Sequence, residues 1–167
     1  MDSIACLWGI KASFLGYVAK QHGAEVSIGG GTATTTTNEF LFPATVDMPA
    51  IGPDGMKFEG DVQFTAHGGM LNVVLADPWI QLDQNQTVLS VITGGYSGST
   101  GTRTVIAELV EREPVDADGS VTYNATLAST GVQVFDGVYA PGEPLDPVRT
   151  VRNPPSIHPT MQRAKKN

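Results

Sequence analysis

The sequence is poor in cysteine, in positive charge and in long apolar runs. Its single cysteine, Cys6, has no partner for an internal disulfide, so the fold must be stabilised by packing alone. With 10 Lys and Arg against 17 Asp and Glu, the chain has a net charge of −7, which works against binding to phosphate backbones. The composition therefore argues against a nucleic-acid partner.

The longest apolar stretches, such as residues 70–76, are far shorter than the roughly 20 residues that cross a bilayer. The sequence predicts no membrane-spanning helix. The first residues also lack the basic segment and apolar run that are typical of an export signal. We therefore expect a signal peptide to be absent or already removed.

What the sequence does contain favours one strand-rich domain. Its 167 residues are enough for one core but too few for two ordinary domains. The 19 glycines and the many Thr and Val residues indicate a turn-rich protein with a preference for strands. We expect the domain to span residues 1–149. Residues 150–167, rich in Pro, Arg, Lys and Asn, are predicted to form a flexible tail.

The periodicity predicts one helix followed by short strands. Ile10, Phe14, Tyr17 and Val18 follow steps of three and four, which predicts a helix over residues 9–22. Alternating or apolar runs predict strands at 55–67, 70–82, 87–93, 102–111 and 120–128. Residues 132–140 are expected to close the domain. The predicted fold class is mainly β: an antiparallel β-sandwich-like or barrel-like domain with one or two short helices.

Common catalytic and ligand spacings are missing. The chain has no G-x-S-x-G, H-E-x-x-H, C-x-x-C or P-loop pattern. His67 follows a strong strand, where a histidine is more often a hydrogen-bonding turn residue than a ligand. Tyr17 lies on the predicted helix, where a tyrosine usually buries its ring and leaves its hydroxyl to water. The residues alone leave both interpretations open.

Three stretches nevertheless resemble one family. They are "WGIKASFLGYV" at 8–18, "FTAHGGMLNVVLADPWIQL" at 64–82 and "VFDGVYAPGEPLDPV" at 134–148. In this order they resemble motifs of the HtaA family, haem-binding domains from the haem-uptake systems of corynebacteria and related actinobacteria. The resemblance covers residues 6–149. Two positions depart from the family pattern: Ala66 stands where glycine is common, and Trp79 where a basic residue is common.

The resemblance implies a ligand set for ferric haem b, Fe(III) protoporphyrin IX. Tyr17 on the N-terminal helix would be the axial ligand of the iron, and His67 would hydrogen-bond to its phenolate oxygen. Ser13 could reach a haem propionate and Phe14 could lie against the porphyrin. A solvent-facing hydroxyl and plain core packing are the alternatives for these two residues. Lys11 is either a solvated helix residue or a further aid to propionate binding.

The implied function is haem acquisition or relay at the cell envelope, without turnover. Expected partners are haem itself and haemoproteins or other haem-uptake proteins. We expect the protein to be secreted or attached to the cell surface, with a cytoplasmic location left open by the missing signal. One alternative is a haem-free β-sandwich used for adhesion, which the Thr-rich loops would allow. Another is a peroxidase-like or catalase-like enzyme, which is disfavoured because no distal histidine with an acid–base partner is evident.

Overall fold

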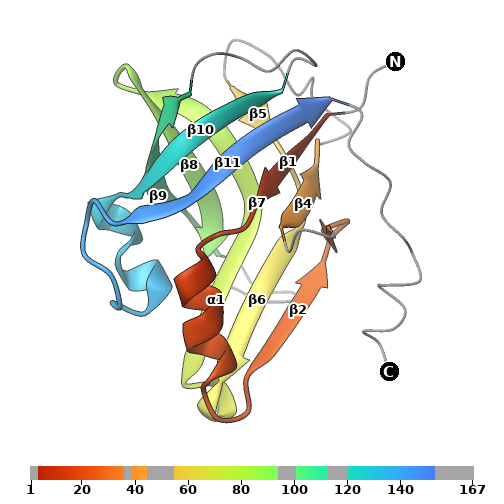
Figure 1. Ribbon diagram of the computed structural model, residues 1–167, viewed down its shortest axis with the longest axis vertical. Helices are drawn as coiled ribbons and strands as arrows, with labels where there is room; N and C mark the ends of the chain where they lie inside the picture. The colour runs from red at the N-terminus through yellow and green to blue at the C-terminus, as the bar shows by residue number, and fades with distance from the viewer. Residues whose placement is uncertain (1–3, 36–38, 45–54, 94–100, 113–119, 153–167) are drawn as a thin grey trace.

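The computed structural model describes residues 4–35, 39–44, 55–93, 101–112 and 120–152. The strands of these residues form one antiparallel sheet that curls into a nearly closed barrel (Figure 1). They are β1 (Ile4–Trp8), β2 (Glu25–Gly29), β3 (Ala33–Thr34), β4 (Phe40–Pro43), β5 (Met56–Lys57), β6 (Asp61–Ala66), β7 (Leu71–Asp83), β8 (Gln86–Thr93), β9 (Thr102–Glu111), β10 (Val121–Leu127) and β11 (Pro144–Arg152). The strand order is β2-β6-β7-β8-β9-β10-β11-β1-β4-β3, and β5 pairs with β7.

Helical structure is short in the described chain. The one α-helix, α1 (Ala12–Ala19), leaves β1 and lies beside β6 (Figure 1). Three 3₁₀ turns follow later: η1 (His67–Gly69), η2 (Ser129–Gly131) and η3 (Gln133–Phe135). None of the described helices is long and apolar enough to cross a membrane.

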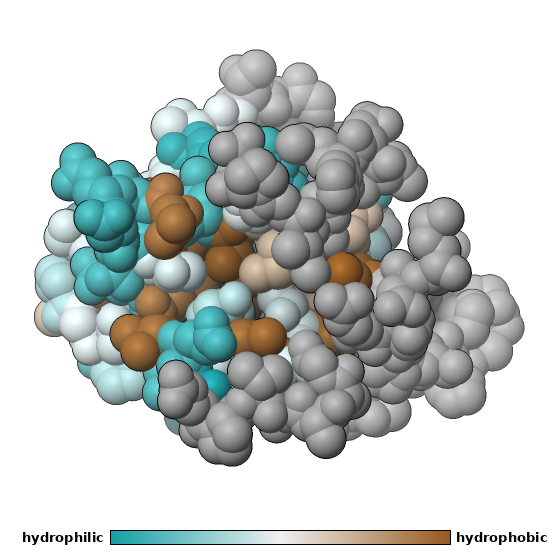
Figure 2. All heavy atoms as spheres, turned by 90° about the horizontal axis from the view of Figure 1, so that it is seen from above, coloured by the Kyte–Doolittle hydropathy of each residue, from teal (hydrophilic) through white to brown (hydrophobic). Residues whose placement is uncertain are grey.

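The predicted fold class is confirmed, and alternation explains the strands that were expected. In β6, Val62, Phe64 and Ala66 are buried and the residues between them are not, as one buried face of a strand requires. Phe64 pairs with Val73 of β7. Seen from above in Figure 2, the described residues show hydrophobic residues between hydrophilic ones.

The expected helix over residues 9–22 is wrong at both ends. Residues 4–8 form β1, which lies between β11 and β4. Ile10 has a φ of 66°, a left-handed conformation that ends the strand and that a helix cannot contain. The helix begins only at Ala12 and stops at Ala19. The apolar spacing placed the helix to within three residues at each end, but the strand before it is buried without alternation and was not predicted.

The last strand lies later than residues 132–140, which contain η3 and a turn. β11 runs to Arg152, three residues beyond the expected boundary at 149. Thr150 and Val151 pair with Cys6 and Ala5 of β1. The predicted tail therefore begins inside this pairing, and residues 153–167 lie outside the described residues. The division into domain and tail stays a prediction.

Two truncations test where the domain ends. A chain that stops at Arg152 keeps every described pair of β11, so we expect its melting temperature to stay close to that of the full chain. A chain that stops at Arg149 loses the pairs of Thr150 and Val151 with β1 and should melt several degrees lower. Calorimetry of both chains measures the difference. Equal melting temperatures for the two truncated chains would show that these pairs add nothing to stability.

Candidate functional site

The two long sides of α1 have different surroundings. Phe14 and Val18 are buried against the barrel, whereas Ser13 is exposed and Tyr17 is half-buried. The Phe14 ring meets the Phe64 ring edge-on at a centroid distance of 5.5 Å. The centroid of the Tyr17 ring lies 6.3 Å from that of Phe14. The helix therefore presents a phenol and a hydroxyl, four residues apart, outside an aromatic core.

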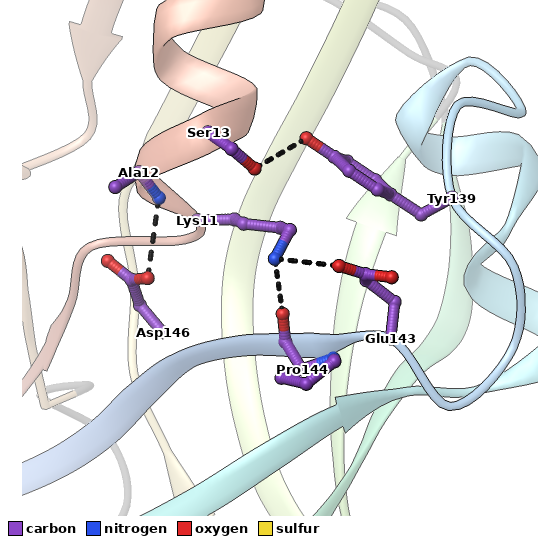
Figure 3. Close-up of polar contacts among 7 residues, drawn as sticks. All are labelled: Lys11, Ala12, Ser13, Tyr139, Glu143, Pro144 and Asp146. Carbon is purple, nitrogen blue, oxygen red and sulfur yellow. Dashed lines mark hydrogen bonds and ion pairs between the residues drawn. The ribbon is translucent and has the colours of Figure 1, made fainter.

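Asp146 of β11 fixes the start of α1. The Asp146 N–H donates to the Ile10 carbonyl at 2.9 Å, and the Asp146 carbonyl accepts from the Trp8 indole at 2.9 Å. Its carboxylate accepts from the Ala12 N–H at 3.3 Å (Figure 3), so a distant strand supplies the N-terminal cap that Lys11 does not. A Cβ on Gly9 would lie 2.7 Å from the same carboxylate, so a larger residue at position 9 would push the carboxylate away from its place at the helix start.

A second contact joins the helix to the segment before β11. Ser13 Oγ and the Tyr139 hydroxyl form a hydrogen bond of 3.0 Å (Figure 3). Lys11 Nζ lies 3.1 Å from Glu143 and donates to the Pro144 carbonyl. The charge of Lys11 therefore already has an acidic partner. The two hydroxyls share one hydrogen, so the pair retains one O–H that can donate to a ligand.

His67 lies at the other end of the helix. It is the first residue of η1 and has a φ of 54°. Its N–H donates to the His22 carbonyl at 2.8 Å, and its Nε2 lies 2.9 Å from Gln21 Oε1. Gln21 Nε2 in turn donates to the Tyr17 carbonyl at 2.8 Å. Among the described residues the imidazole thus bonds to Gln21, and its expected bond to the Tyr17 phenol oxygen stays a prediction.

The structure brings Ser13, Phe14 and Tyr17 to one helix and places His67 beside the end of that helix. Sequence reasoning missed Gln21 and Tyr139 as site residues. Gln21 lies four residues after Tyr17, and Tyr139 lies inside the third motif stretch, so both had a signal in the sequence. Within the described ranges, no group of three or more His, Cys, Asp or Glu side chains could hold a metal ion.

A cavity of about 700 Å³ lies beside the face of α1 that carries Ala12, Leu15 and Ala19, and not beside the face with Ser13 and Tyr17. Its described lining residues are Gly9, Ala12, Leu15, Val18, Ala19, Ala24, Val26, Thr34, Glu39, Phe40, Phe64 and Asp146. Ser13, Phe14, Tyr17 and His67 are not among them. The helix therefore separates the phenol from this cavity.

The sequence pattern that defines the HtaA family, described as Htaa, matches residues 3–151. The chain belongs to the HtaA family. The match includes all three motif stretches, and two of them meet in the structure, since Trp8 and Gly9 of the first contact Asp146 of the third. No curated protein matches the chain.

Solved structures from Corynebacterium glutamicum resemble this HtaA-family chain. The C-terminal domain of HtaA is 25% identical with a TM-score of 0.70, over 90% of this chain and 96% of that one. Heme binding protein HtaB is 22% identical with a TM-score of 0.70, over 92% and 96%. A histidine-to-alanine variant of the HtaA C-terminal domain, a domain-swapped dimer, is 26% identical with a TM-score of 0.59, over 87% and 93%.

Several titratable groups on the strands have displaced pKa values. Burial and then the charge of Glu39 raise the pKa of Cys6 to about 12, so this thiol is neutral at physiological pH. Burial and then Asp77 raise the pKa of Asp61. Burial and nearby charges raise the pKa of Tyr123 on β10. These shifts reflect the packing of the barrel.

Replacing Asp146 tests the cap of α1. Asp146→Ala removes the acceptor of the Ala12 N–H but keeps both backbone bonds, so we expect a loss of about 1–2 kcal/mol in the free energy of unfolding. Urea denaturation measures this loss. Asp83→Ala, at an exposed strand end, is the matched control and should change stability by no more than about 0.5 kcal/mol. An Asp146→Ala chain as stable as the control would show that the cap is dispensable.

Proposed function

We propose that this protein binds ferric haem through the phenolate of Tyr17 and takes part in haem acquisition or relay at the cell envelope. The observation that carries the proposal is Tyr17, a half-buried phenol whose oxygen has no hydrogen bond to the described part of the chain. The chain around it belongs to the HtaA family, and its fold is that of a protein named for heme binding. The cell-envelope role rests on the family alone.

The residues around Tyr17 suit a phenolate that binds iron. Haem would supply a ferric iron that accepts an oxygen ligand. Tyr17 would hold the iron as its phenolate, so its hydroxyl proton would have to leave, because a free tyrosine keeps that proton up to a pH of about 10. A neighbouring imidazole can take that proton and then donate it back in a hydrogen bond to the phenolate. His67 is the imidazole beside this end of α1.

The polar and apolar edges of haem also have candidate partners. The remaining O–H of the Ser13–Tyr139 pair can donate to a propionate, whereas Lys11 is engaged by Glu143 and contributes less charge than the sequence suggests. Met70 and Val138 are 87% and 41% exposed. Met70 lies shortly after His67 in the sequence, and Val138 lies directly before Tyr139. We expect both side chains to lie against the porphyrin. Phe14 is completely buried and would support the site from below.

The alternatives are separated by two simple measurements. A haem-free adhesion module would give no absorbance change when hemin is added, whereas the proposal predicts a tyrosinate-type visible spectrum. A peroxidase-like enzyme would oxidise a dye with hydrogen peroxide faster than free hemin does. We expect the loaded protein to be no faster than free hemin, because the proposal assigns it binding and release.

Removing the phenol oxygen tests the iron ligand. Tyr17→Phe keeps the ring and takes away one oxygen, so the phenolate-to-iron charge-transfer bands should disappear and hemin affinity should fall by at least about a hundredfold. The melting temperature should hardly change, because the Tyr17 oxygen has no described partner. Titration with hemin followed by visible spectroscopy measures both effects. Unchanged spectra would assign the iron to another residue.

Removing the imidazole should have a smaller effect. His67→Ala should keep tyrosinate ligation but release hemin at least about tenfold faster, since a hydrogen bond to a charged group contributes about 1.5–3 kcal/mol. Transfer of hemin to excess apomyoglobin measures the release rate. Because a histidine-to-alanine variant of the HtaA domain is a domain-swapped dimer, the monomer should first be isolated by size-exclusion chromatography. A larger loss for His67→Ala than for Tyr17→Phe would exchange the roles of the two residues.

A further inference from the structure

Gln21 connects Tyr17, the proposed iron ligand, with His67, the proposed hydrogen-bond partner of that ligand. It lies in the turn after α1, four residues beyond Tyr17. Its Nε2 donates to the Tyr17 carbonyl at 2.8 Å, and its Oε1 lies 2.9 Å from His67 Nε2. The amide therefore links the last turn of α1 with the first residue of η1. This link lies at the C-terminal end of α1, which is its lower end in Figure 1.

This link determines which nitrogen of His67 carries hydrogen. A backbone carbonyl can only accept, so the amide nitrogen of Gln21 must face the Tyr17 carbonyl and the amide oxygen must face His67. An amide oxygen also only accepts, so His67 Nε2 must donate. In a neutral imidazole the other nitrogen, Nδ1, is then the acceptor.

The backbone alone does not fix the ring. The His67 N–H is held by the His22 carbonyl at 2.8 Å, but the His67 side chain is exposed. The next two residues, Gly68 and Gly69, have φ values of 65° and 100° and no Cβ. Within the described part of the chain, Gln21 is the one hydrogen-bonding partner of the imidazole. The position of the ring thus depends on a single side-chain bond.

We propose that Gln21 is a positioning residue for His67, which holds the imidazole beside Tyr17 with hydrogen on Nε2 and with Nδ1 free for the Tyr17 hydroxyl. The inference rests on the proposed haem site and adds the residue that orders its histidine. Gln21 itself would not touch the iron. Its effect on haem passes through His67.

The first test needs no haem. Long-range ¹H–¹⁵N correlation spectra of the full chain at alkaline pH report the tautomer of each of its three histidines, and the His67→Ala spectrum identifies the signals of His67. We expect the Nε2–H form in the unaltered chain and a mixture of both tautomers in Gln21→Leu. Gln63→Leu is the matched control, because it removes a surface glutamine bonded to Asn72 and should leave the His67 signals unchanged.

The second test measures hemin release to excess apomyoglobin. Gln21→Leu should release hemin about three- to tenfold faster than the unaltered chain, and Gln63→Leu should not. In the His67→Ala background, Gln21→Leu should cause no further change, because the residue through which it acts is gone.

Each outcome separates this inference from the function beneath it. If the unaltered chain binds hemin but Gln21→Leu changes neither the tautomer nor the release rate, the role of Gln21 is overturned and the haem site stands. Slower release from Gln21→Leu would also overturn it, since Gln21 would then hold His67 away from Tyr17. If the unaltered chain binds no hemin, the proposed function fails, and with it any role of Gln21 in haem binding.

Discussion

Three hydrogen bonds to one residue, Asp146, decide how the chain leaves the barrel and turns into α1. They engage the indole of Trp8, the carbonyl of Ile10 and the N–H of Ala12. Between β1 and α1 the chain has to turn within three residues, and it does so through the left-handed Ile10. A helix of eight residues is too short to be stable on its own. The direction of the phenol on α1 therefore depends on β11.

This dependence gives two of the family motifs a structural meaning. Trp8 and Gly9 in the first motif and Asp146 in the third are far apart in sequence but in contact in space. A Cβ at position 9 would lie 2.7 Å from the carboxylate of Asp146 and would displace it, and Lys11 pairs with Glu143 of the same segment. These residues of the first and third motifs thus hold the start of the helix in place.

Several strands could be predicted from the sequence, because alternating burial, as in β6, places every second side chain toward the interior and leaves a period of two in the sequence. β1 could not, since four of its five residues are buried and its sequence therefore has no alternation. β11 contains Pro144 and Pro147, which argue against a strand unless its pairing is known. Strand order and pairing depend on contacts that local periodicity does not encode.

The candidate site divides in the same way. Tyr17 and His67 follow from motif positions, but their polar neighbours depend on side-chain directions across long separations, as in the bond of Ser13 to Tyr139. Both ends of α1 are held by distant parts of the chain: Asp146 binds its first turn, and His67 binds the turn after it through Gln21. Tyr17 lies in the last turn, nearer the second attachment. A displacement of the Tyr17 oxygen should therefore shift the β6–β7 hairpin, which carries His67, more than it shifts β11.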